Sequence, residues 1–149
     1  MAVFSRFEDI EAWQLARQLC NMIHAWTLRP EFSKNFKLRD QIEGSSGSIM
    51  DNIAEGYERG GNKEFVNFLS IAKGSCGETR SQCYRVLDFK YINQIEFDEA
   101  YALCMKISTK ITNLMNYLID SDRKGFKFDN KNKDKTKNKG GDQHFPQNE

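Results

Sequence analysis

The sequence predicts an all-α fold, an antiparallel up-down-up-down four-helix bundle with a disordered C-terminal tail. Four segments of about 20 residues repeat apolar residues with the helical period. The 149 residues include two prolines and ten glycines, too few for a loop-rich β fold. The length suits one domain and an extension. We therefore assign residues 1–120 to the bundle and residues 121–149 to the tail.

The first predicted helix runs from about Glu8 to Leu28 and ends before Pro30, because a residue before proline disfavours the α region. Its apolar residues cover about 180° of the helical wheel, more than one bundle seam requires. The second helix runs from Phe36 or Leu38 to Glu58, across the weak helix-forming stretch Glu43–Ser48. Gly60 and Gly61 are predicted to end this helix, since glycine easily adopts the left-handed cap conformation.

The third predicted helix begins at Asn62, a favourable N-cap residue, and runs to about Phe89. The fourth runs from about Phe97 to Ile119, and its apolar arc covers about 200°. Short connections make consecutive helices antiparallel neighbours. After Asp120 the sequence is rich in Lys, Asn, Asp and Gly. Such a segment buries too little apolar surface to offset its ordering entropy, so we expect it to be disordered.

Charge is distributed unevenly along the chain. The net charge is +1, which gives no indication of a strongly basic nucleic-acid binder. The bundle region is net −2, whereas residues 123–139 hold eight basic and two acidic side chains. The tail lysines are candidate nucleic-acid contacts through counterion release, and a merely solubilising tail is the alternative. These candidates are Lys131, Lys133, Lys135, Lys137 and Lys139.

The third helix carries two further candidate surfaces. Lys73 and Arg80 lie seven residues apart, and Tyr84 follows one turn later, a pattern typical of a phosphate-contacting face with an aromatic residue. A solvated flank is the alternative. Opposite the apolar stripe, small residues leave a flat strip of backbone, and we expect it to contact another copy of the chain. This strip consists of Ser70, Gly74, Gly77 and Ser81.

Catalytic and metal-binding patterns are weak. Asn52, Glu55 and Arg59 have helical spacing, but a plain (i, i+4) ion pair explains the last two. Asp51 and Glu55 resemble paired carboxylates without the Glu-x-x-His partner of a di-metal bundle. His24 lies far from any ligand cluster, as does His144. We expect no enzyme activity and no cofactor.

The cysteines and the N-terminus point to a cytoplasmic protein. The four cysteines have no C-x-x-C spacing and fall on apolar stripes, as free core thiols in a reducing compartment would. They are Cys20, Cys76, Cys83 and Cys104. The charged N-terminal stretch has no signal-peptide pattern, and no apolar run is long enough to span a membrane.

A longer motif carries a family resemblance. Phe7–Leu19 and Leu38–Gln82 resemble the bacterial four-helix bundle family of intervening-sequence proteins, encoded in insertions within large-subunit rRNA genes and formerly labelled a ribosomal protein. The match is strongest in Ser48–Ser75, where the family pattern is close to S-I-P-S-N-I-A-E-G followed by K-E-F and F-L-S-I-A-x-G-S. Its structural positions here are Asn52, Glu55 and Gly56.

The resemblance implies an assembly and a role. Family members resemble the accessory variability protein of diversity-generating retroelements, a pentameric barrel that binds nucleic acid and associates with a reverse transcriptase. The resemblance thus implies a homopentamer with RNA or DNA as a partner. We expect a non-enzymatic, oligomeric scaffold of a nucleic-acid-associated kind. The alternative is a nucleic-acid-binding accessory factor of a diversity-generating reverse transcriptase.

Overall fold

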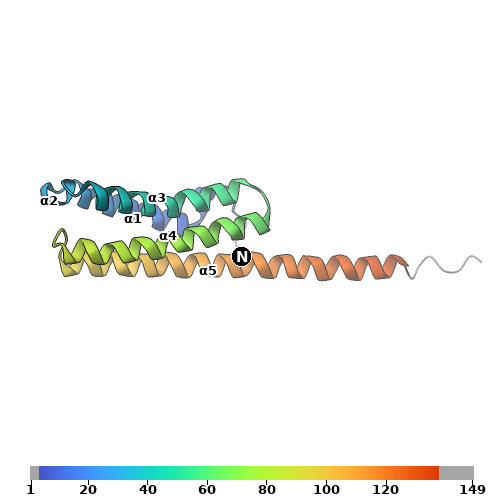
Figure 1. Cartoon of the computed structure of the whole chain (residues 1–149). Coiled ribbons are helices and arrows are strands. Elements are labelled where there is room, and N and C mark those ends of the chain that lie inside the picture. The colour runs from blue at the N-terminus through green and yellow to red at the C-terminus, as the bar shows by residue number, and fades with distance from the viewer. Residues whose placement is uncertain (1–3, 138–149) are drawn as a thin grey trace, which may run out of the picture.

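The computed structural model describes residues 4–137, and side chains for residues 4–125. Every regular element in this part of the chain is a helix (Figure 1). This confirms the predicted all-α class. The elements are the 3₁₀ turn η1 (Phe7–Asp9), α1 (Glu11–Thr27), α2 (Pro30–Ser33), α3 (Phe36–Glu58), α4 (Asn62–Asp88) and α5 (Gln94–Lys137).

The four long helices form one bundle. Helix α3 packs against α1 and α4, and α5 packs against α4 and α1, so that each long helix has two neighbours. The connections through α2 and between α4 and α5 lie at one end of the bundle, and the connection between α3 and α4 lies at the other (Figure 1). Consecutive helices are therefore antiparallel, as the sequence predicts.

The core combines aliphatic side chains from all four long helices, in the predicted stripes. The stretch Glu43–Ser48 is helical as expected, and Ser45 and Ser46 within it are buried. Their small side chains fit where α3 passes close to its neighbours, so tertiary packing outweighs weak helix propensity. The fully buried aliphatic residues include Leu19, Ile23, Ile42, Ile49, Ile53, Leu69, Ile107 and Ile111.

The first helix ends as predicted, at Thr27 with Leu28 as its C-cap, but differs from the prediction at its start. It begins at Glu11 rather than Glu8, because η1 precedes it and the buried Ile10 is extended at the N-cap, with ψ of 119°. The predicted connection also contains α2, whose Pro30 has a backbone φ suited to the first helical position. Phe32 of α2 is buried and stacks on Tyr91 at a ring distance of 4.7 Å.

The connection between α3 and α4 agrees with the prediction at the end of α3 and differs from it at the start of α4. Gly60 has a φ of +85° just after the C-cap of α3, which confirms the left-handed ending. The prediction that Asn62 caps α4 is wrong, because Gly61 is the N-cap and makes no side-chain cap. The Asn62 amide instead donates a hydrogen bond to Asp122 on α5, at 2.9 Å.

Helix α5 is longer than the sequence predicts. The predicted end at Ile119 is wrong, and residues 121–137 are helical where the sequence predicts disorder. The bundle part of α5 is already helical, so the helix extends without a new nucleation step, even though the added residues include weak helix formers. The 44 residues of α5 span about 66 Å, so its last part projects beyond the bundle (Figure 1). Residues 138–149, which include Lys139 and His144, lie outside the described residues.

Candidate interaction surface

The small-residue strip of α4 lies on the surface, as predicted. Ser70, Gly74, Gly77 and Ser81 are all exposed along one side of the helix. A Cβ atom added at Gly74 or Gly77 would meet no heavy atom within 4 Å. The backbone of α4 is therefore open to close approach along this strip.

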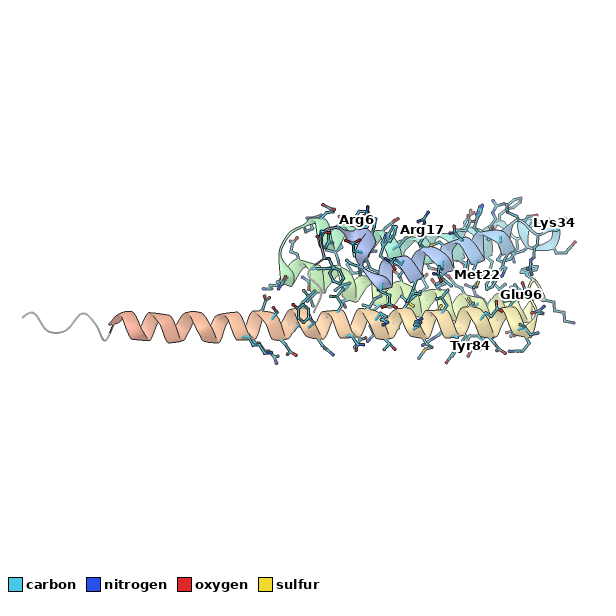
Figure 2. The ribbon with its side chains drawn as sticks, turned by 180° about the vertical axis from the view of Figure 1, so that it is seen from behind. Arg6, Arg17, Met22, Lys34, Tyr84 and Glu96 are labelled. Atoms are coloured by element: carbon cyan, nitrogen blue, oxygen red, sulfur yellow. The ribbon has the colours of Figure 1, made fainter. Side chains whose placement is uncertain are left out.

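Partly exposed apolar and aromatic side chains border the strip. Tyr84 is 48% exposed, and its ring lies 4.8 Å from that of Phe97 on α5. Tyr101 follows at 6.0 Å from Phe97, and Met105 is 40% exposed one turn further along α5. Figure 2 shows Tyr84 beside α5. We call the strip together with Tyr84, Tyr101 and Met105 the α4–α5 face.

Arg80 is held at this face by neutral partners. Its Nη1 donates to the Met105 sulfur at 2.6 Å, and its guanidinium lies 5.8 Å from the centre of the Tyr101 ring. Among the side chains of residues 4–125, no carboxylate pairs with Arg80. Cation–π contact holds the side chain without neutralising its charge. Lys73 is exposed two turns earlier on α4, so both predicted cations adjoin the strip.

The predicted lysines of the tail fall elsewhere. Lys131, Lys133, Lys135 and Lys137 belong to the projecting part of α5. Lys139 follows outside the described residues. The candidate nucleic-acid contacts are thus divided between the α4–α5 face and the far end of α5.

The family-motif residues have structural roles. The Asn52 amide donates to the carbonyl and the hydroxyl of Ser48 at 2.8 and 2.9 Å. Glu55 accepts a hydrogen bond from Arg59 at 3.1 Å, which confirms the predicted (i, i+4) pair. A Cβ on the buried Gly56 would lie 2.5 Å from the Cβ of Phe68 on α4. Gly56 therefore allows α3 and α4 to approach closely.

A run of hydroxyl groups and one side-chain amide also joins α3 to α4. The Ser48 and Ser75 hydroxyls lie 2.9 Å apart, and Thr79 donates to Ser45 at 2.9 Å. Ser45 in turn donates to the Gln82 side-chain oxygen at 2.5 Å. We call these five residues the hydroxyl seam. Sequence reasoning missed it, although small polar residues do recur at helical spacing in both segments.

A histidine–carboxylate pair was also missed, because it joins two helices. Nδ1 of His24 lies 2.7 Å from Glu43 Oε1, and the Thr27 hydroxyl donates to the same oxygen at 2.9 Å. The hydrogen bond with His24 is the main reason that the pKa of Glu43 is lowered. In a catalytic triad the hydroxyl contacts the imidazole, and the imidazole contacts the carboxylate. Here the Thr27 hydroxyl contacts the carboxylate instead, so the three residues do not form such a triad.

The cysteines are free, and three of them are buried, as the sequence predicts. Burial raises the pKa of the Cys83 thiol to about 12. The hydrogen bond with Cys76, together with burial, raises the pKa of Cys104. Burial also raises the pKa of the half-buried Cys20. These three thiols therefore stay protonated at neutral pH, unlike a nucleophilic cysteine.

Two shallow hollows flank the base of the projecting helix. They have volumes of about 370 and 460 Å³ and share Phe4, Leu114 and Tyr117 in their walls. The second hollow includes Lys110, whose ammonium pairs with Glu11 at 2.9 Å. In the part of the chain that the structure describes, no three His, Cys, Asp or Glu residues are placed to hold a metal ion. No helix there is long and apolar enough to cross a bilayer.

The described residues thus define a helical bundle with a flat, partly aromatic face along α4 and α5. The chain belongs to the 23S rRNA-intervening sequence protein family, whose sequence model matches residues 8–113. This confirms the resemblance seen in the sequence.

A solved structure shares the fold. It is a protein of unknown function from the S23 ribosomal protein family of Bacteroides thetaiotaomicron, with a TM-score of 0.64 and 19% sequence identity. The similarity covers 70% of this chain and 97% of that one. No curated protein matches this chain.

Proposed function

We propose that this protein is a non-enzymatic scaffold that self-associates through its α4–α5 face. The observation that carries the proposal is the open strip above Gly74 and Gly77, bordered by exposed tyrosines. Glycine inside a helix costs about 1 kcal/mol relative to alanine, and solvent exposure gives no compensation. Close approach of a second helix does compensate, because backbones then pack in direct contact.

The aromatic border supports the same reading. Tyrosine is enriched among the residues that dominate binding energy at protein interfaces, and arginine shares this property. Tyr84, Tyr101 and Arg80 meet at one side of the strip. A face of this kind that contacts a different face of the next copy generates a ring. The family resemblance suggests five copies in that ring.

The test is the native mass of the full chain at micromolar concentration, measured by light scattering with circular dichroism alongside. Gly77→Arg fills the strip with a bulky charge and should lower the mass several-fold without loss of helicity. Gly44→Arg is the matched control, because Gly44 is also an exposed helical glycine with open space above it, but on α3. A mass of 17 kDa for the unmodified protein would overturn the proposal, and dissociation by Gly44→Arg alone would move the contact to α3.

A second candidate function is nucleic-acid binding, and the projecting part of α5 favours it. Between Arg123 and Lys137 the chain has seven basic and two acidic residues, carried away from the acidic bundle. Lys73 and Arg80 adjoin the strip, so a copy docked there would cover them. The projecting helix is therefore the better candidate for phosphate contacts. A reverse-transcriptase partner stays a prediction from the resemblance.

Fluorescence anisotropy with labelled single-stranded RNA and DNA tests this second function. About four phosphate contacts imply a roughly 50-fold loss of affinity between 50 and 200 mM salt. Removing residues 123–149 should abolish that binding, whereas Lys73→Ala should change it little. Equal affinity of the truncated and full chains would exclude the projecting helix as the binding element.

A further inference from the structure

The end of the bundle away from the projecting helix is unusually apolar. Leu28, Phe36, Phe89 and Ile95 are 67%, 65%, 52% and 70% exposed. Each lies at a terminus of a different long helix: Leu28 follows α1, Phe36 opens α3, Phe89 follows α4 and Ile95 lies in the first turn of α5. These four termini lie together at one end of the molecule (Figure 1). We call these four residues the end face.

Tyr91 ties the end face together. Its carbonyl accepts a hydrogen bond from Arg29 and its hydroxyl accepts one from Asn35, both at 3.1 Å. Its ring lies 6.0 Å from that of Phe89, and Arg29 also pairs with Glu96. Arg29, Asn35 and Glu96 each adjoin an end-face residue in the chain. The four helix termini that carry the end face are therefore linked to one another through Tyr91, Arg29 and Glu96.

The turn that presents Phe89 is well formed. Lys90 has a left-handed φ of 65°, its N–H donates to the Leu87 carbonyl at 2.9 Å, and the Tyr91 N–H donates to Val86 at 3.0 Å. This pair of bonds is a Schellman motif, here built on lysine instead of glycine. The end face is thus held by defined backbone geometry rather than by a frayed helix end.

The exposed apolar area is sufficient for a contact between two copies. At roughly 200 Å² for each side chain, the four residues leave about 500 Å² open to solvent, in the range of the largest patch on a typical monomer. Two such faces in contact would cover about 1,000 Å², the lower bound of a specific interface. Polar residues around the patch would add to that area.

The charges around the patch indicate its partner. Residues 28–40 and 88–98 balance to zero, so they offer no net attraction to a nucleic acid, an anionic membrane or an acidic peptide. Several of the charges here already pair within the chain, Arg29 with Glu96, Lys34 with Glu31 and Arg39 with Asp40, so what the patch lacks is an apolar partner. A second copy of the same end face supplies such a neutral, apolar surface. Figure 2 shows Lys34 and Glu96 at this same end. The charged residues are Arg29, Lys34, Lys37, Arg39 and Lys90 against Glu31, Asp40, Asp88, Glu96 and Asp98.

We infer that two copies of the chain pair end to end through the end face, about a two-fold axis. The projecting helices then point away from the joint, since each leaves the opposite end of its bundle (Figure 1). This contact uses none of the residues of the α4–α5 face. If the proposed lateral ring also forms, the two contacts together give a dihedral assembly with twice the number of copies in one ring.

The experiment is the native mass of the full chain and of single-site variants. Ile95→Lys and Phe36→Lys should each halve the mass with unchanged helicity, because each places a charge in the middle of the joint. Tyr117→Lys is the matched control, because Tyr117 is 37% exposed on α5 near the α3–α4 connection, at the opposite end of the bundle. Its mass should stay that of the unmodified protein. Unchanged mass in both end-face variants would overturn the inference, as would an equal halving by Tyr117→Lys.

Gly77→Arg separates this inference from the lateral contact. With the lateral contact removed, the end-to-end pair should persist at twice 17.3 kDa. A single chain in Gly77→Arg would overturn the end-to-end pair and leave the lateral proposal intact. A two-copy protein that Gly77→Arg leaves unchanged, and that Ile95→Lys splits, would support the end-to-end pair and overturn the lateral ring.

Discussion

Helix α4 shares the aliphatic core with both of its neighbours, but its remaining contacts with α3 and with α5 differ in chemistry. On the α3 side, the hydroxyl seam and Gly56 make short, directional contacts. On the α5 side, thiols and aromatic rings fill the space, and Tyr84 stays about half exposed. Hydrogen bonds specify one alignment of two helices, because a shifted partner leaves buried groups unpaired. Apolar contact depends mainly on area and is less directional.

This difference explains where the free surface lies. No buried side-chain N or O atom of residues 4–125 lacks a partner, so the buried polar side chains of the α3–α4 contact are all hydrogen-bonded. The α4–α5 contact leaves Tyr101 and Met105 partly exposed beside the glycine strip. The side of α4 that faces α3 therefore leaves no buried polar side chain unpaired. The side that faces α5 leaves apolar surface exposed, which a partner can cover.

The strongest test of the close α3–α4 contact is Gly56→Leu. The first added carbon would already lie 2.5 Å from the Phe68 Cβ, so the helices must move apart. Overpacking of this kind should cost about 3 kcal/mol of unfolding free energy or more. Urea denaturation measures it, with Gly44→Leu as control. The control has open space above its glycine and should gain a few tenths to 1 kcal/mol from helix propensity. Equal stability of the two variants would contradict the close contact.

Gly56 also shows what sequence reasoning reaches and where it stops. Apolar period alone predicts the four long helices and most of their stripes, because each helix must bury one side. The clash at Gly56 depends on Phe68, 12 positions later on another helix, so no local pattern reveals it. The Asn62 cap fails for the same reason, since Asp122 competes for its side chain.

The candidate surface was predictable only in part. The glycine strip follows from its position opposite the apolar stripe of α4. The end face does not, because its four residues come from four helix termini and meet only through Tyr91. The wide apolar arc of α5 predicts that some of its apolar residues stay exposed. It does not predict that Tyr101 and Met105 are among these residues.

Thr79→Val tests the hydroxyl seam itself. The substitution keeps the shape of the side chain and removes a hydroxyl that lies 2.9 Å from both Ser45 Oγ and the Ser75 carbonyl. With those buried groups left short of a partner, unfolding free energy should fall by about 1–2 kcal/mol. Ser81→Ala, on the exposed strip of the same helix, should change it by less than about 0.5 kcal/mol. An equal effect of the two changes would show that the seam adds nothing to the alignment of α3 with α4.

A smaller effect on the unfolding free energy is expected at the Arg29–Glu96 pair. It joins the C-terminus of α1 to the N-terminus of α5 and lies outside both contacts of α4 described above. The Arg29 guanidinium lowers the pKa of Glu96, so this pair stabilises the fold above the ordinary carboxyl pKa. That contribution is lost as pH falls through the lowered pKa. Glu96→Gln should therefore cost about 0.5 kcal/mol at pH 7 and progressively less as the pH falls through that lowered pKa, measured by urea denaturation at each pH. Glu58→Gln controls for the change in net charge. A cost that stays constant with pH would assign the effect to shape rather than charge.

The smallest effect is expected where α5 has neither kind of contact. Beyond Leu118, which is 8% exposed, residues 120–125 are exposed. The Asn62–Asp122 hydrogen bond is an exposed contact to the bundle in this stretch, and a chain that ends at Asp122 keeps it. An unpartnered helical segment of this length is marginal in water and adds little to the cooperative unit. Removing residues 123–149 should therefore shift the melting temperature by less than about 5 °C, on the order of 1 kcal/mol. A larger drop would mean that the projecting helix packs on a bundle, its own or that of another copy, and concentration-dependent melting of the full chain would distinguish these two cases.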